Sequence, residues 1–215
     1  MLTGKHIVVI ANGAMDDYDY FKQVLIKADY IIAADGGLKH LDKMDVSPTL
    51  MLGDFDSIES IAYYKERFPE AEVKTFEIRK DYTDSELAVR IAIDYKPSKV
   101  TLLGVTGSRL DHTMANVTLL KLIYDAGIEG LIVNEHNTVR YSEASMKLGG
   151  EIGTNMSIVP LSEEVSGITL SGFEYPLFEA TLAFGSTTGI SNVFAEEQAE
   201  VKIRSGRMLV LQSRD

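Results

Sequence analysis

The chain has 215 residues, of which 21 are basic and 32 are acidic, and its formal net charge is −11. This acidic balance argues against a nucleic-acid partner, because binding a phosphate backbone requires a basic surface. The sequence contains no cysteine, which excludes disulfides, thiolate metal sites and cysteine nucleophiles.

No apolar run in the sequence approaches the roughly 18 residues that a membrane-spanning helix needs. The apolar run of residues 7–11 is also shorter than the ~7 to 15 residues of a signal-peptide core. We therefore expect a cytoplasmic protein without a membrane partner.

The first part of the chain alternates short apolar runs with longer stretches of helical periodicity. This alternation is typical of an α/β fold with a doubly wound, mostly parallel sheet. The expected strands are His6–Ile10, Tyr30–Ala34, Thr49–Leu52, Glu72–Phe76, Lys99–Val105 and Gly130–Val133.

Two helix starts can be read from the sequence of this part. Thr83 and Glu86 form a capping box, in which the Thr83 hydroxyl accepts from the Glu86 backbone N–H and the Glu86 side chain reaches back. A second helix is expected to start close to Asp111 and to run to Ala126, with Gly127 just after its end.

The pattern changes after about residue 134. Residues 1–126 contain 7 glycines and the remaining 89 residues contain 10, while the apolar segments become short and alternating. We predict an α/β domain over residues 1–134 and a C-terminal antiparallel β-sandwich domain over residues 135–215. The expected turns are Gly149-Gly150, Ser166-Gly167, Ser171-Gly172 and Ser205-Gly206.

Carboxylates follow four successive strands of the predicted sheet, at the edge where parallel α/β sheets bind ligands. Asp54 and Asp56 are two residues apart in an expected extended segment, so both side chains would point to the same side. Two such carboxylates suit Mg²⁺, which shares its other positions with water and phosphate oxygens. Alternatively, Asp56 or Ser57 caps the following helix.

Charged residues also surround the start of the helix after the fourth predicted strand. Asp81 and Asp84 either compensate the helix dipole and cap the helix, or lie beside a bound phosphate. Lys80 would supply a cation for that phosphate, unless it is merely a solvated lysine.

The loop of residues 104–112 is glycine-rich and follows an apolar strand, but it contains neither a Walker nor a Rossmann glycine motif. Arg109 could hold a phosphate bidentately and Asp111 could orient it. The alternative is that Asp111 is only the N-cap of the next helix.

The predicted β domain offers groups that could bind a heterocycle. Residues 185–192 form a loop rich in hydroxyl and amide groups, or else a plain hairpin connection. Tyr175 and Phe178 could stack on an aromatic ring, or they could belong to the core.

The motifs, in this order and at this spacing, resemble the thiamine pyrophosphokinase family over nearly the whole chain. They are Asp35-Gly36-Gly37, Gly53-Asp54-Phe55-Asp56-Ser57, Asp81-Tyr82-Thr83-Asp84, Arg109-Leu110-Asp111-His112 with Asn116, and Ser191-Asn192.

The resemblance implies a homodimer that uses Mg²⁺ to transfer a pyrophosphoryl group from ATP to the hydroxyethyl oxygen of thiamine, giving thiamine diphosphate and AMP. The thiamine pocket would lie between the catalytic domain of one subunit and the β domain of the other. By motif match, the catalytic and metal-binding residues are Asp54, Asp56 and Asp84. The ATP and phosphate site comprises Asp35, Lys80, Asp81, Arg109, Asp111 and Asn116, and thiamine contacts Tyr175, Ser191 and Asn192.

Two other functions are open at this point. A haloacid-dehalogenase-like phosphatase is one, because Asp54 and Asp56 imitate its paired aspartates. However, that motif normally ends the first strand, and here it follows the third. The other is a non-catalytic regulator that binds nucleotide or thiamine, although such a protein is expected to lose metal carboxylates that this chain keeps.

Overall fold

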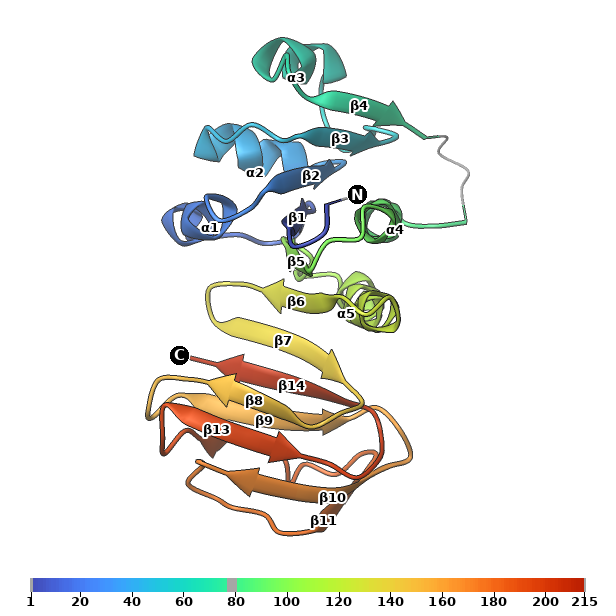
Figure 1. Cartoon of the computed structure of the whole chain (residues 1–215). Helices are drawn as coiled ribbons and strands as arrows, with labels where there is room; N and C mark the ends of the chain where they lie inside the picture. The colour runs from blue at the N-terminus through green and yellow to red at the C-terminus, as the bar shows by residue number, and fades with distance from the viewer. Residues whose placement is uncertain (1, 77–80, 215) are drawn as a thin grey trace. The chain divides into compact units, whose positions relative to one another are not determined.

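The computed structural model describes residues 2–76 and 81–214 of the chain. The chain forms two compact units, Met1–Glu135 and His136–Asp215, and Figure 1 labels the elements of each. No helix among the described residues is long and apolar enough to cross a membrane.

The first unit contains a parallel sheet with the strand order β6-β5-β1-β2-β3-β4. This confirms the predicted parallel α/β fold. The strands are β1 (His6–Ile10), β2 (Tyr30–Ala34), β3 (Leu50–Gly53), β4 (Glu72–Thr75), β5 (Lys99–Leu103) and β6 (Glu129–Val133). The helices are α1 (Tyr18–Leu25), α2 (Gly37–Met44), α3 (Ile61–Arg67), α4 (Asp84–Asp94) and α5 (Leu110–Asp125).

Helices cover both faces of this sheet, with α1, α2 and α3 on one side and α4 and α5 on the other (Figure 1). Along β1, Val8 and Ile10 pack in one cluster with Phe21 of α1 and Leu41 of α2. The intervening side chain of Val9 is fully buried as well. Because both faces are covered, β1 reads as a continuous apolar run rather than as an alternating one.

The helix starts agree only in part with the sequence. Thr83 is the N-cap of α4, and its hydroxyl accepts from the Glu86 N–H at 3.2 Å, as predicted. Helix α5 starts at Leu110, close to Asp111 as predicted, but its N-cap is Arg109, so the alternative that Asp111, which lies in the first turn, caps this helix is wrong. Asp111 is still well placed there, because a carboxylate in the first turn interacts favourably with the helix dipole.

The second unit is a sandwich of two antiparallel sheets, which confirms the predicted β-sandwich class. One sheet has the order β12-β9-β14-β7 and the other β11-β10-β13-β8. Ile158 and Val210 of the first sheet share a buried cluster with Ile168 and Val201 of the second. The strands are β7 (Asn137–Ser142), β8 (Met146–Gly149), β9 (Asn155–Pro160), β10 (Glu164–Ser171), β11 (Ala180–Ala183), β12 (Asn192–Val193), β13 (Gln198–Lys202) and β14 (Met208–Ser213).

One predicted turn of this unit is instead part of a strand. Ser166 and Gly167 lie inside β10, where the register against β11 shifts between Val165 and Ile168. Gly167 has a φ of +66°, so it supplies the left-handed residue of a β-bulge. A serine-glycine pair therefore marks a change of backbone direction here without ending the strand.

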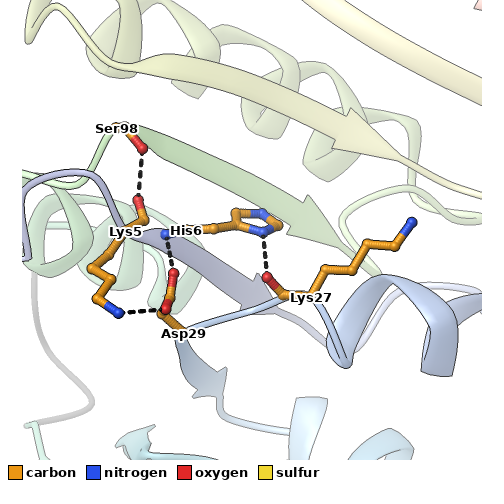
Figure 2. A network of polar contacts seen from close by, with 5 residues as sticks. All are labelled: Lys5, His6, Lys27, Asp29 and Ser98. Carbon is orange, nitrogen blue, oxygen red and sulfur yellow. Dashed lines mark hydrogen bonds and ion pairs between the residues drawn. The ribbon is translucent and has the colours of Figure 1, made fainter.

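A polar network fastens the start of β1 to its neighbours in the first unit (Figure 2). The Asp29 carboxylate accepts from the Lys5 ammonium and from the His6 backbone N–H, both at 2.8 Å. The His6 ring lies 3.3 Å from the Lys27 carbonyl through Nδ1 and 2.8 Å from the Thr101 hydroxyl through Nε2. A carbonyl only accepts, so Nδ1 carries the proton and Nε2 accepts from Thr101.

Burial lowers the pKa of His6 below its usual 6.5. The unfolded chain then binds more protons than the folded one as the pH falls through 6.5, so His6 destabilises the fold there. We expect the thermal midpoint to fall between pH 7 and pH 5, and to fall less in the variant His6→Gln, whose amide does not titrate. An equal loss in both proteins, measured by circular dichroism, would show that His6 does not contribute.

Candidate functional site

The candidate site lies at the carboxyl edge of the parallel sheet. The strand order reverses between β1 and β5, and in open α/β sheets ligands bind beyond the strand ends at such a point. The loops after these two strands are in close contact, because the Gly13 N–H donates to the Gly104 carbonyl at 2.6 Å. A Cβ atom on Gly13 would lie 2.4 Å from the carbonyl oxygens of Gly104 and Thr106, so only glycine fits there.

Three carboxylates meet at the same edge, beyond β2 and β3. Asp35 follows β2, and Asp54 and Asp56 follow β3. One oxygen from each side chain lies within 4.8 Å of the others, which makes this group able to hold a metal ion. The set joins Asp35, which the family resemblance assigns to the ATP and phosphate site, to two of the three residues that it assigns to metal.

The backbone brings Asp54 and Asp56 together in a different way from the one expected. The segment is not extended, because Phe55 between them has a left-handed φ of +62°. The buried Phe55 side chain packs in the core cluster of the unit, so the chain must turn sharply at this point. Asp56 and Ser57 do not cap the next helix, whose N-cap is Ser60, so that alternative is wrong.

Asp35 carries the most unusual oxygen of the group. The residue is only 8% exposed, and its Oδ1 atom is buried with no hydrogen-bond partner among the described residues. Its φ of +46° is also left-handed, which is uncommon for a residue with a side chain. A buried, unpaired carboxylate oxygen costs free energy unless a cation or donor satisfies it. The donor set, all carboxylate oxygen, fits a hard cation such as Mg²⁺.

The residues around the start of α4 lie outside this set. Asp84 is in the first turn of α4 and is half-buried, and Asp81 is exposed just before it. Neither belongs to the group of three carboxylates in the described part of the chain. Lys80, a predicted phosphate ligand, lies outside the described residues.

Arg109 and Asp111 form an exposed ion pair at the start of α5. Arg109 Nη2 lies 2.6 Å from an oxygen of Asp111, and Arg109 Nε lies 3.2 Å from the other oxygen. The hydrogen bond from Arg109 and the backbone N–H of His112 lower the pKa of Asp111. The guanidinium is thus held above the loop after β5, with most of its surface in solvent.

Asn116 has a role inside the fold. Its side chain is buried, and Nδ2 donates to the Val105 carbonyl at 2.8 Å. This bond fixes the chain just after β5, where Gly104 has a left-handed φ of +60°. The structure therefore places Asn116 beneath the loop that carries Arg109.

In the second unit, Tyr175, Ser191 and Asn192 lie together. The Asn192 amide bridges the backbone of Tyr175: its Oδ1 accepts from the Tyr175 N–H at 3.0 Å and its Nδ2 donates to the Tyr175 carbonyl at 2.8 Å. The Tyr175 side chain itself is 58% exposed. Asn192 thus holds Tyr175 in place, while the Tyr175 ring and the exposed Ser191 remain accessible within this unit.

Sequence reasoning missed the loop after β1. Asn12 and Gly13 lie at the switch point, and the His40 ring lies 2.9 Å from the Gly13 carbonyl. The available signal is a glycine three residues after the apolar first strand, but it belongs to no recognised motif. His40 had no ligand-like spacing, and only the packing of α2 reveals its contact.

The chain is similar to known proteins over most of its length. The family model described as "Thiamin pyrophosphokinase, catalytic domain" matches residues 21–131, and "Thiamin pyrophosphokinase, vitamin B1 binding domain" matches residues 143–208. The thiamine pyrophosphokinase of Bacillus subtilis is 28% identical over 187 residues, which are 86% of this chain and 87% of that one.

Solved structures show the same similarity. A crystal structure of thiamine pyrophosphokinase from Bacillus subtilis aligns with a TM-score of 0.87 at 27% identity, covering 98% of this chain and all of that one. One of thiamin pyrophosphokinase from Geobacillus thermodenitrificans aligns with a TM-score of 0.85 at 28% identity, covering 98% of each chain.

These matches favour the pyrophosphokinase over the phosphatase and the non-catalytic regulator. The chain belongs to the thiamin pyrophosphokinase family, and its activity is that of a thiamine diphosphokinase, a kinase-type transferase of thiamine diphosphate biosynthesis.

Proposed function

We propose that Asp35, Asp54 and Asp56 hold Mg²⁺ and that the polyphosphate of ATP binds beside them at the carboxyl edge of the sheet. The observation that carries this proposal is the group of three carboxylates, in which one buried oxygen of Asp35 has no partner. When bound, the ion would neutralise polyphosphate charge and orient the transferred group.

In the proposed reaction, the hydroxyethyl oxygen of thiamine attacks the β-phosphorus of ATP. The bond from this phosphorus to the oxygen bridging the α- and β-phosphates breaks, AMP leaves, and the hydroxyl proton passes to a nearby carboxylate. Arg109 would pair with phosphate oxygens, since its guanidinium is exposed at the start of α5. Asp81, Asp84 and Lys80 would line the phosphate site, and Asp111 would orient Arg109.

The charge of the chain suits its proposed second substrate. Thiamine carries a fixed positive charge on its thiazolium ring, and a protein with a net charge of −11 attracts it before binding. In the second unit, the exposed ring of Tyr175 would stack on the pyrimidine, with Ser191 offering a hydroxyl. Asn192 would act by holding the Tyr175 backbone.

We further propose that the working form is a homodimer with the thiamine site between the subunits. The second unit exposes several large aromatic side chains, and aromatic residues are enriched at protein–protein interfaces. Tyr175, Phe178 and Phe184 are 58%, 85% and 68% exposed. A partner subunit that covers them would bring its own carboxylate group to the ring of Tyr175.

The direct test is to incubate the protein with thiamine, ATP and Mg²⁺ and to separate the products by chromatography. AMP and thiamine diphosphate should appear in equal amounts and should vanish when EDTA removes the metal. ADP with thiamine monophosphate would show transfer of a single phosphoryl group and would overturn the proposed reaction.

The metal assignment predicts that Asp54→Asn lowers kcat by about a hundredfold or more with little loss of stability, because one charged metal ligand is lost. Asp94→Asn, an exposed aspartate at the far end of α4, serves as the matched control and should keep full turnover. Steady-state kinetics with a thermal melt of each variant would check this. Near-normal turnover of folded Asp54→Asn would contradict the assignment.

The stacking assignment predicts that Tyr175→Ala raises the KM for thiamine about tenfold and leaves the KM for ATP nearly unchanged. A lost stacking interaction of roughly 1.4 kcal/mol gives a tenfold effect. Tyr175→Phe keeps the ring and should behave like the unchanged protein. If both KM values rose together in Tyr175→Ala, the ring would be supporting the fold instead.

The shared-site proposal predicts that two impaired variants restore one another when thiamine is kept well below its KM, where Tyr175→Ala retains about a tenth of the activity. After subunit exchange between Asp54→Asn and Tyr175→Ala, a mixed dimer would contain one doubly defective site and one intact site. Random mixing makes half of the dimers mixed, so about a quarter of the full activity should return. Activity that stays at the average of the two separate variants would place each site within a single chain.

A further inference from the structure

Asn12 is an exposed side chain at the centre of the candidate site for which the family motifs give no role. It follows β1, whose neighbours are β2 and β5, and its Cγ would lie 2.4 Å from a Cβ atom on Gly36. Its amide thus lies against the residue that follows Asp35. Within residues 2–76 and 81–214, the structure records no hydrogen bond to this amide, so the fold does not use it.

The backbone on both sides of Asn12 is held tightly. The Ala11 N–H donates to the Leu103 carbonyl at 2.9 Å, and the Gly13 N–H donates to the Gly104 carbonyl at 2.6 Å. The Ala14 N–H donates to the Thr106 carbonyl at 2.8 Å. The fixed backbone and the packing of the Asn12 amide against Gly36 limit where this side chain can lie, and its hydrogen-bonding groups stay available to a ligand.

His40 fixes the other side of the same loop. Its Nε2 lies 2.9 Å from the Gly13 carbonyl, and its Nδ1 lies 3.0 Å from the Tyr18 hydroxyl. A carbonyl only accepts, so Nε2 carries the proton and Nδ1 accepts from Tyr18. The His40 ring of α2 therefore contacts both the loop after β1, at Gly13, and the first residue of α1, Tyr18.

His40 is suited to remain neutral in this position. Burial lowers its pKa, the Gly13 carbonyl opposes this, and the charges of Lys43 and Lys39 on the same helix add to the lowering. Tyr18 of α1 also faces the ring, and the Lys43 ammonium lies 5.5 Å from the centre of the Tyr18 ring. A neutral ring keeps one donor and one acceptor, which both contacts need.

We propose that the Asn12 amide donates a hydrogen bond to a phosphate oxygen of the bound nucleotide, and that His40 is the positioning residue that holds the Asn12 loop for this contact. The inference rests on the proposed function, since it names one more contact to the same substrate. A phosphate oxygen only accepts hydrogen bonds, and the carboxylates nearby have no proton to donate, so a contact to phosphate at this position needs a donor such as the Asn12 amide.

The first test is equilibrium binding of MgATP in the absence of thiamine, measured by calorimetry, with the KM for ATP and for thiamine in parallel. Asn12→Ala should weaken MgATP binding about tenfold, as expected for one lost hydrogen bond to a charged group, with an unchanged melting temperature. Asn12→Asp should weaken it further, because the new carboxylate only accepts and repels phosphate. The KM for thiamine should stay unchanged in both.

The second test is a double-mutant cycle. His40→Ala alone should raise the KM for ATP severalfold, but it should add little in the Asn12→Ala background, because both act through the same contact. His40→Gln retains an N–H donor for Gly13 and should recover most of the loss. His6→Ala is the control: it removes another half-buried histidine at the start of β1, and its effect on stability should be independent of Asn12.

Each result decides between a binding role and a structural one. Normal MgATP binding by Asn12→Ala, or normal binding by Asn12→Asp, would overturn the contact. If His40→Ala raised the KM for ATP equally with Asn12 and with Asn12→Ala, His40 would have only a structural role. If His40→Ala does not fold, the KM for ATP of His40→Gln is compared in the same two backgrounds instead. If the unchanged protein formed no thiamine diphosphate, the proposed function would fail instead, and MgATP binding would still test Asn12.

Discussion

The meeting of three carboxylates, Asp35, Asp54 and Asp56, at the carboxyl edge of the sheet is the feature on which the rest of the site depends. Their oxygens lie within 4.8 Å of one another, and a buried oxygen of Asp35 has no partner in the described chain. Like charges at this distance destabilise a fold unless a cation offsets them. Burial of apolar side chains in the core of the first unit, among them Val8, Ile10 and Phe21, contributes stability that offsets this cost.

Backbone contacts and a buried side-chain amide hold the loops after β1 and β5. Gly13 and Gly104 let the loops after β1 and β5 approach to hydrogen-bonding distance, and Asn116 fixes the chain after β5 from below. Left-handed backbone at Asp35 and Phe55 adds local strain. These features leave the edge of the sheet rigid, which suits a reaction that depends on positioning and charge neutralisation.

In the second unit, too, a side-chain amide holds the backbone of a residue that is exposed to solvent. The Asn192 amide makes two hydrogen bonds to the backbone of Tyr175. The exposed Tyr175 ring is therefore attached to a fixed backbone. Tyr is enriched at binding interfaces because it combines an apolar ring with a polar hydroxyl. In both units, therefore, a buried amide holds a loop backbone: Asn116 binds the Val105 carbonyl, and Asn192 binds the backbone of Tyr175.

The sequence alone determined those features of this protein that depend on residues close together in the chain. Apolar runs alternating with helical stretches indicate the parallel sheet, Thr83 marks the start of α4, and acidic residues mark the carboxyl edge. The tertiary structure alone decided which groups meet. Asp35 joins Asp54 because β2 and β3 are neighbours, and the packing of Phe55 in the core turns Asp56 towards them. Contacts between distant segments depend on strand order and on single backbone angles, which no local pattern of residues encodes.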